Sequence, residues 1–191
     1  MAFYPVNLNL DKKRCVVVGG GKVAARKLAA LIESGADVLV ISPEVCPKIE
    51  GMVRENRVRL EKRPYKRGDL EGAVLCIAAT NNREVQLALE QEAVEQKVLL
   101  NSIDDQQACD FQVPSRVRRG KLLLTVSTGG GSPAFSKFMR KRLEQEFGPE
   151  YGELVCLLSI IRRMLLAENE ESEAIKELFG KLVEEEYIQF I

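Results

Sequence analysis

The 191-residue chain contains no histidine and no tryptophan. Histidine is the commonest general base and the commonest metal ligand, so its absence leaves acid–base chemistry to carboxylates and gives no reason to assign metal ligands. The five cysteines are odd in number and never form a C-x-x-C pair, which disfavours a disulfide framework and a zinc site. Reduced thiols are typical of a reducing compartment, and we expect a cytoplasmic protein.

The sequence also lacks a hydrophobic run long enough to cross a membrane. The longest apolar stretch near the C-terminus, "LVCLLSIIRRMLLA", is interrupted by Arg162 and Arg163 and is too short to span a bilayer. The first residues show no basic segment followed by an apolar one, so no signal peptide is predicted. We therefore expect no membrane partner.

Acidic residues are missing from one segment of a chain whose net charge is zero. Residues 116–142 contain eight basic residues and no acidic one, whereas residues 144–191 contain twelve acidic and four basic residues. This segregation favours a local anionic partner, and a solvated cationic face that pairs with the acidic segment is the alternative. Nucleic acid is not expected as the partner, because the basic run is short and has few aromatic residues for base stacking.

The first hundred residues alternate between short aliphatic runs and segments of helical periodicity. Near-continuous aliphatic strands separated by helices predict an α/β fold with a parallel sheet that is covered on both faces. A helix is expected between the first two strands, with Gly35 as its C-terminal stop. The expected strands are residues 14–18, 37–41, 58–62, 73–79 and 97–100.

The pattern changes after the first 113 residues. Residues 116–128 predict one or two strands, a helix begins near Pro133, and two amphipathic helices are expected at about 150–167 and 171–188. This smaller part has little core of its own, so we expect its apolar faces to pack against the first part or against a second copy of the chain. The apolar stripe of the helix that begins near Pro133 comprises Phe135, Phe138, Met139, Leu143 and Phe147.

A glycine-rich turn follows the first expected strand, in "CVVVGGGKVAARK". Aligned as G-x-G-x-x-A, Gly19 makes the tight turn, Gly21 lets the backbone approach a pyrophosphate, and Ala24 keeps the helix close to the sheet. The turn opens a helix, whose N–H groups and dipole favour phosphate. We predict a dinucleotide site here, with a plain tight turn as the alternative. Its residues are Gly19, Gly20, Gly21, Lys22 and Val23.

Polar residues follow the second and fourth expected strands and would line the same crevice, because ligands bind beyond the carboxyl ends of parallel strands. The segment "VISPE" is expected around the adenosine ribose, and no arginine follows it to pair with a 2′-phosphate, so NAD is favoured over NADP. In "IAATNN", either of the two asparagines could equally cap the next helix. The residues assigned to the cofactor here are Ser42, Pro43, Glu44, Thr80 and Asn81.

Three carboxylates follow the fifth expected strand in "NSIDDQQACDF", namely Asp104, Asp105 and Asp110. Loop aspartates are usually turn formers, and that reading stays open for each of them. Asp104 differs by its place just beyond a strand end, where a nicotinamide would lie. In a chain without histidine a carboxylate is the favoured proton acceptor, so we predict that Asp104 is catalytic.

The segment "STGGGSP" is a second glycine-rich loop that opens a helix, with Ser132 as the predicted N-cap and Pro133 in the first turn. Basic residues flank the loop on both sides, which suits a polyanion that carries phosphate or several carboxylates. The residues predicted to bind such a substrate are Ser127, Thr128, Gly129, Ser132, Arg116 and Lys137.

The chain resembles the NAD-dependent precorrin-2 dehydrogenase and sirohydrochlorin ferrochelatase family, the siroheme synthase module. The resemblance covers most of the chain in the expected order. It lies in the segments "FYPVNLNL", "VVVGGGKVAARK", "VISPE", "IAATNN", "NSIDDQQACDF" and "VSTGGGSPAFSKFMRKRLE".

The resemblance implies a Rossmann domain at 1–113, a dimerisation and substrate-binding region at 114–147 and a helical region at 148–191. It implies a homodimer that oxidises precorrin-2, a tetrapyrrole edged with carboxylates, to sirohydrochlorin by hydride transfer to NAD. In bifunctional members ferrous iron is then inserted. The family's proposed general base, the aspartate of "N-x-x-D", falls on Asp104. The alternative function is a non-catalytic NAD-sensing module that acts through a protein partner.

Overall fold

The computed structural model describes residues 3–105, 107–168, 177 and 180–182 of the chain. The chain divides into two compact units. One unit is Tyr4–Gln112, and the other contains Phe3 and the described residues from Val113 onwards. The second helix expected near the C-terminus, 171–188, falls almost wholly outside the described residues.

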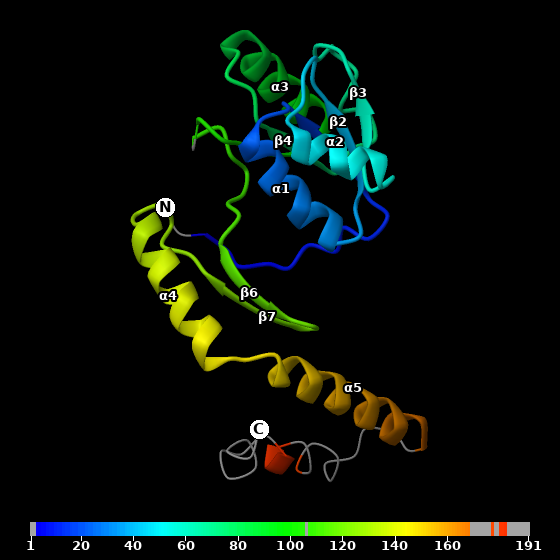
Figure 1. The fold of residues 1–191 in the computed structure, drawn as a ribbon, viewed down its shortest axis with the longest axis vertical. Helices are drawn as coiled ribbons and strands as arrows, with labels where there is room; N and C mark the ends of the chain where they lie inside the picture. The colour runs from blue at the N-terminus through cyan, green and yellow to red at the C-terminus, as the bar shows by residue number, and fades with distance from the viewer. Residues whose placement is uncertain (1–2, 106, 169–176, 178–179, 183–191) are drawn as a thin grey trace. The chain divides into compact units, whose positions relative to one another are not determined.

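The Tyr4–Gln112 unit is a five-stranded parallel sheet with helices on both faces (Figure 1). The strand order is β3-β2-β1-β4-β5, which is the doubly wound order in which the chain reverses direction beside the first strand. The predicted Rossmann-type fold is therefore confirmed. The elements are β1 (Arg14–Val18), α1 (Lys22–Glu33), β2 (Asp37–Ile41), α2 (Pro47–Arg54), β3 (Arg59–Glu61), β4 (Leu75–Ala78), α3 (Arg83–Gln96) and β5 (Leu99–Ser102).

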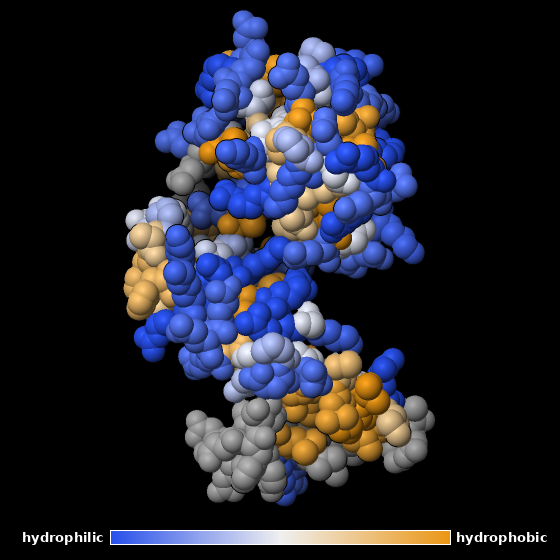
Figure 2. All heavy atoms as spheres, in the orientation of Figure 1, coloured by the Kyte–Doolittle hydropathy of each residue, from blue (hydrophilic) through white to orange (hydrophobic). Residues whose placement is uncertain are grey.

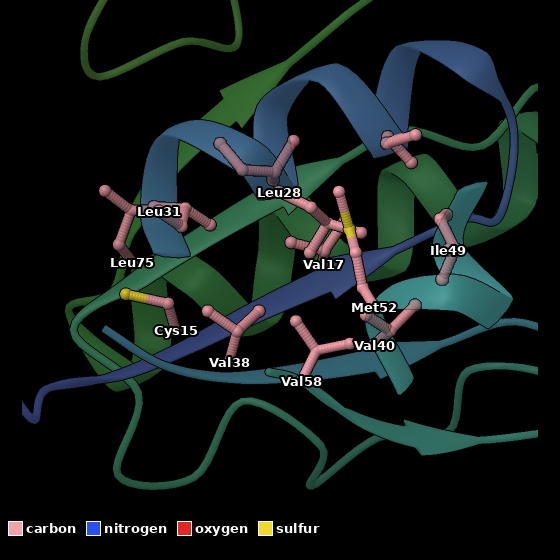
Figure 3. Close-up of a cluster of buried hydrophobic side chains, with 13 residues drawn as sticks. Cys15, Val17, Leu28, Leu31, Val38, Val40, Ile49, Met52, Val58 and Leu75 are labelled. Carbon is pink, nitrogen blue, oxygen red and sulfur yellow. The ribbon is translucent and has the colours of Figure 1, made fainter. Parts of the chain in front are cut away.

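Alternate residues of the strands face two separate hydrophobic clusters. Figure 3 shows Leu28 and Leu31 of α1 and Ile49 of α2 packed over one face of the sheet. On the opposite face, Leu89 and Ala93 of α3 pack with the other set of strand residues. Burial on both faces explains why β1, β2 and β4 are almost continuously aliphatic.

The first two strands have the bounds that the sequence predicts, whereas β5 begins two residues later than expected. Lys97 adopts a left-handed conformation, with φ of 56°, and forms the C-cap of α3. The strand therefore begins at Leu99, which pairs with Leu75 of β4. Asn101 and Ser102, expected in the loop, are the last residues of β5. Gly35 has a positive φ of 73° after α1, which confirms it as the helix stop.

The second unit is an antiparallel hairpin covered by helices. Strands β6 (Ser115–Arg119) and β7 (Leu122–Val126) pair with each other, and both contact α4 (Pro133–Glu146) and α5 (Glu150–Glu168). Buried side chains are sparse in this part of the chain, and Val117 is its one fully buried hydrophobic residue among those described. In the described part of the chain, no helix is both long and apolar enough to cross a membrane.

Candidate functional site

The turn between β1 and α1 is held in place by close backbone packing. Gly19 has φ of 125°, and a Cβ there would lie 2.1 Å from the carbonyl oxygen of Ala79. A Cβ on Gly20 would lie 1.9 Å from the carbonyl oxygen of Glu44. These two glycines are therefore required by the protein itself, because any side chain would collide with the backbone of the neighbouring strand ends.

Gly21 differs from the two glycines before it. A Cβ built on Gly21 meets no protein atom within 4 Å, and its φ of −80° is open to any residue. It is the N-cap of α1 without a side-chain hydrogen bond to the first turn of the helix. The position therefore leaves an open approach to backbone N–H groups at a helix N-terminus, which fits the phosphates of a dinucleotide. Ala24 is fully buried against the sheet, as the predicted third position of the fingerprint requires.

The end of β2 lies beside this turn. Ser42 is buried, and its hydroxyl donates a 2.6 Å hydrogen bond to the carbonyl oxygen of Glu44. The amide of Cys46 donates to the carbonyl of Gly20, so the segment after β2 is tied directly to the glycine turn. Pro43 and Glu44 are exposed. The segment of the three residues assigned to the ribose is thus held next to the glycine turn by hydrogen bonds.

The structure beyond the end of β4 shows which of the two asparagines, Asn81 or Asn82, caps α3. Asn82 is the N-cap, since its side-chain oxygen accepts hydrogen bonds from the amides of Glu84 and Val85. Thr80 Oγ1 in turn accepts from the Asn82 amide at 3.2 Å. Asn81 is left exposed beyond the strand end, where it stays a candidate for cofactor contact.

The three carboxylates after β5 have different surroundings. Asp105 Oδ1 accepts from the amide of Gln107 at 2.9 Å, and Asp110 Oδ2 accepts from the amide of Leu100 at 2.8 Å. These two aspartates stabilise the local backbone, which is the turn-forming role considered above. Asp104 is exposed, as Asp110 is, but its carboxylate accepts a 2.9 Å hydrogen bond from the side chain of Gln86 and not from a backbone amide. Of the three, Asp104 is therefore the one available for chemistry.

The sequence reasoning missed Gln86. It lies one turn inside α3, is 4% exposed, and donates through Nε2 both to Asp104 and to the carbonyl oxygen of Thr80. Its spacing offered one signal, because it follows the N-cap by four residues on a helix that starts at the carboxyl edge of the sheet. Apart from this spacing, nothing in the sequence distinguishes Gln86 from the other polar residues of the helix.

Lys27 and Asn101 form a second polar contact that the sequence did not predict. Lys27 Nζ donates a 3.1 Å hydrogen bond to Asn101 Oδ1, which joins α1 to the end of β5. Burial lowers the pKa of Lys27, and burial raises the pKa of the nearby Cys109 thiol. Cys109 Sγ lies 3.2 Å from the amide of Ser102. The polar groups at this strand end are thus largely engaged with one another.

The second glycine-rich loop is organised by hydroxyl groups. Ser132 is the N-cap of α4, as predicted, and its Oγ accepts from the amide of Phe135 at 3.2 Å. Thr128 Oγ1 accepts from the amide of Ser132 at 3.0 Å and lies 3.2 Å from Ser136 Oγ. Ser127 Oγ accepts from the amide of Gly129, whose φ is 60°. The loop is therefore built to present a helix N-terminus.

Two of the basic residues around this loop have structural roles. Arg119 donates to the carbonyl oxygens of Glu144 and Phe147 at the C-terminus of α4, and Arg140 pairs with Glu144 one turn along the helix. Lys137 is exposed on α4, and Arg116 lies half-buried on β6. Among the described residues, no group of three cysteine or carboxylate side chains could hold a metal ion.

The glycine turn, Ser42, Thr80 and Asp104 follow the carboxyl ends of parallel strands, so they lie along one edge of the sheet. This edge, with the open approach at Gly21, defines a Rossmann-type dinucleotide-binding protein. A family model described as "Putative NAD(P)-binding" matches residues 6–115, and the chain belongs to that family.

Curated proteins and a solved structure are similar over nearly the whole chain. The siroheme synthase of Methylobacillus flagellatus is 36% identical over 180 residues, which cover 94% of this chain and 36% of that protein. The siroheme synthase of Thioalkalivibrio sulfidiphilus is 32% identical over 184 residues, which cover 96% of this chain and 38% of that protein. The chain thus spans little more than a third of the length of these relatives.

A solved structure described as "SirC, precorrin-2 dehydrogenase" matches this chain with a TM-score of 0.79 and 26% sequence identity. The match covers 97% of this chain and 92% of the SirC chain. The similarity therefore extends over both compact units and not only over the dinucleotide-binding one.

Proposed function

We propose that this chain catalyses the NAD-dependent oxidation of precorrin-2 to sirohydrochlorin. The observation that carries the proposal is Asp104, an exposed carboxylate held by a side chain at the same sheet edge as the glycine turn. The similarity to SirC over 97% of the chain supports the substrate, and the similarity to siroheme synthases supports the same chemistry.

The reaction removes two electrons and two hydrogens from precorrin-2. One hydrogen leaves as a hydride, for which bound NAD supplies the acceptor, and the other leaves as a proton. Asp104 accepts that proton at a carboxylate oxygen, so that precorrin-2 and NAD⁺ give sirohydrochlorin, NADH and H⁺. Gly19, Gly20, Gly21, Lys22 and Val23 hold the pyrophosphate, since the open approach at Gly21 leads to the N-terminus of α1.

The adenosine half of the cofactor is assigned to the ends of β2 and β4. Ser42, Pro43 and Glu44 face the ribose, and Thr80 and Asn81 line the crevice beside it. The exposed Glu44 supports NAD over NADP, because a carboxylate there would accept from ribose hydroxyls and repel a 2′-phosphate.

The carboxylates of the tetrapyrrole are assigned to the second unit. The N-terminus of α4 offers backbone N–H groups, and Lys137 and Arg116 add positive charge. The substrate-binding residues proposed in the loop are Ser127, Thr128, Gly129 and Ser132.

We also propose that the protein is a cytoplasmic homodimer whose subunits meet through the second unit. Phe135 and Phe138 of α4 are 53% and 54% exposed, and α5 exposes Leu157, Ile160 and Met164. Large exposed hydrophobic residues on two consecutive helices favour a protein interface. All five cysteines lie in the described part of the chain and are free thiols, which supports a reducing compartment.

The test mixes the protein anaerobically with NAD⁺ and precorrin-2 and follows NADH and sirohydrochlorin by absorbance. We expect both products in equal amounts from the unmodified protein. Asp104→Asn keeps an oxygen that can accept from Gln86 but cannot take a proton, so we expect kcat to fall by about 10²- to 10⁴-fold with unchanged NAD affinity.

Asp105→Asn is the matched control, because it removes a neighbouring charge and keeps an oxygen for the Gln107 amide. We expect this variant to retain nearly full activity. Full turnover by Asp104→Asn would remove Asp104 from the mechanism. A folded, NAD-binding protein that forms neither product would instead favour the non-catalytic NAD-sensing function.

A further inference from the structure

We infer that Gln86 is a positioning residue that fixes the carboxylate of Asp104 and ties it to the strand end that lines the cofactor crevice. The inference rests on the proposed function, because it assigns a role in the same site. Gln86 itself is assigned no contact with the reacting atoms. It acts through Asp104 and through the backbone of Thr80.

The amide nitrogen of Gln86 joins two loops that are far apart in sequence. Nε2 donates to Asp104 Oδ2 at 2.9 Å, across 18 residues, and to the carbonyl oxygen of Thr80 at 2.8 Å. A primary amide has two N–H groups, so both donors are used. Because Gln86 is 4% exposed, water cannot readily replace either bond, and losing one leaves a buried donor unsatisfied.

The orientation of the Gln86 amide is set by its own helix. Asn82 caps the first turn of α3. The backbone N–H of Gln86 donates to the carbonyl oxygen of Asn82 at 3.0 Å, which fixes the backbone from which the Gln86 side chain extends. Arg83 Nη1 donates to Gln86 Oε1 at 3.4 Å. The oxygen of the amide therefore faces Arg83, and its nitrogen is directed to Asp104 and Thr80.

The carboxylate of Asp104 depends on a side-chain donor, whereas the neighbouring carboxylates of Asp105 and Asp110 do not. Asp105 and Asp110 accept hydrogen bonds from backbone amides, whereas the carboxylate of Asp104 accepts one from the side chain of Gln86. An exposed aspartate without such a donor samples several rotamers. Catalysis by a proton acceptor requires one of them, because misplacement by about 1 Å can cost roughly 100-fold in rate.

The test compares Gln86→Met with Gln91→Met. Methionine has nearly the size of glutamine without its donors, and Gln91 is an exposed residue of the same helix. With precorrin-2 and NAD⁺, we expect Gln86→Met to lower kcat by about 10- to 100-fold while KM for precorrin-2 and Kd for NAD stay within about twofold. Gln91→Met should match the unmodified protein in all three constants.

A second readout does not depend on turnover. The amide of Ile103 donates to the carbonyl of Ala78 at 3.1 Å, beside Asp104. In hydrogen–deuterium exchange, peptides covering 78–82 and 102–105 should exchange faster in Gln86→Met than in Gln91→Met, because the link between the two loops is lost.

Unchanged kcat together with unchanged exchange in a folded Gln86→Met protein would overturn the inference. If Gln86→Met does not fold, Gln86→Glu keeps the side-chain length and an oxygen for Arg83 without the amide donors, and the same two results are expected. If the unmodified protein forms no NADH from precorrin-2, the proposed function fails. The exchange experiment still decides whether Gln86 fixes the Asp104 loop.

Discussion

Three consecutive glycines at the β1–α1 turn have different physical reasons for being glycine. Side chains at Gly19 or Gly20 would collide with the carbonyl oxygens of Ala79 and Glu44. A side chain at Gly21 would enter open space. At the scale of single residues, the steric need for glycine at positions 19 and 20 is therefore distinct from the open position at Gly21, which the proposed function assigns to the phosphates of the cofactor.

Gly20→Ala and Gly21→Ala form a matched pair that tests this separation. We expect Gly20→Ala to destabilise the protein by about 1 to 3 kcal/mol, because the methyl group forces the segment after β2 to move. Gly21→Ala should change the free energy of unfolding by less than about 1 kcal/mol but weaken NAD binding about tenfold or more, because its methyl group occupies the phosphate approach. Urea unfolding and calorimetric NAD titration measure the two effects. Equal NAD affinity in Gly21→Ala and the unmodified protein would argue against a phosphate site there.

At the scale of elements, buried carboxylates fasten the β3–β4 connection to its surroundings. Glu92 of α3 is 1% exposed and accepts from the amide of Leu70 at 2.9 Å. The Tyr65 hydroxyl also hydrogen-bonds to Glu92, and burial together with this hydrogen bond raises the pKa of Tyr65. Asp69 accepts from both Nη atoms of Arg63 at 2.8 and 2.7 Å. The long connection is thereby fastened to α3 by Glu92 and braced internally by the pair of Arg63 and Asp69.

Asp69 should give the stability of the protein an acid-dependent component. Burial alone would raise the pKa of Asp69, but hydrogen bonds from the Arg63 guanidinium and the Lys66 amide outweigh burial and lower it below its ordinary value of 3.8. A lowered folded-state pKa means that the carboxylate stabilises the protein above pH 3.8, and that this contribution is lost as the pH falls through the folded-state pKa.

We expect Asp69→Asn to lower the free energy of unfolding by about 2 to 3 kcal/mol at neutral pH and by progressively less in acid. Urea unfolding at a series of pH values measures this difference. Glu71→Gln, at an exposed position of the same connection, is the control and should leave the curve nearly unchanged. A constant difference between Asp69→Asn and the unmodified protein at all pH values would contradict the assignment.

At the scale of the whole molecule, the described part of the second unit exposes several large hydrophobic side chains. Figure 2 shows hydrophobic residues gathered over α5, and Leu157, Ile160 and Met164 recur there at helical spacing. A hairpin with two helices is too small a unit to bury all of its apolar side chains in a core of its own. This surface supports association with a second copy of the chain.

Leu157→Lys tests that association. An ammonium group buried in a symmetric interface would appear twice without a partner, so we expect the dimer dissociation constant to rise about 100-fold or more. Leu87→Lys is the matched control, since Leu87 of α3 is 44% exposed and Leu157 is 54% exposed. Sedimentation velocity over a range of concentrations distinguishes monomer from dimer. A dimer that survives Leu157→Lys but not Leu87→Lys would place the interface elsewhere.

The sequence determined the parts of the structure that are encoded by local patterns. Buried parallel strands are continuous aliphatic runs, so β1 and β2 were predicted with their correct bounds, and the glycine turn and the Ser132 cap follow from residue types at fixed spacing. Helix α2 was missed although Pro47 in its first turn and the spacing of Ile49 and Met52 indicate it. These features need no knowledge of distant segments.

Only the tertiary structure decided which polar groups meet. Nothing near Gln86 in sequence indicates that its side chain reaches Asp104. Glutamate is a residue type usually found at the surface, yet Glu92 is almost fully buried. The same applies to Gly20, whose steric reason is the carbonyl of Glu44 from the next strand end. Periodicity reports the average burial of a segment. The partner of a particular polar atom depends on the packing of chain segments that the sequence keeps apart. The sequence could therefore single out Asp104 by its place beyond a strand end, but only the folded chain shows that Gln86 holds its carboxylate.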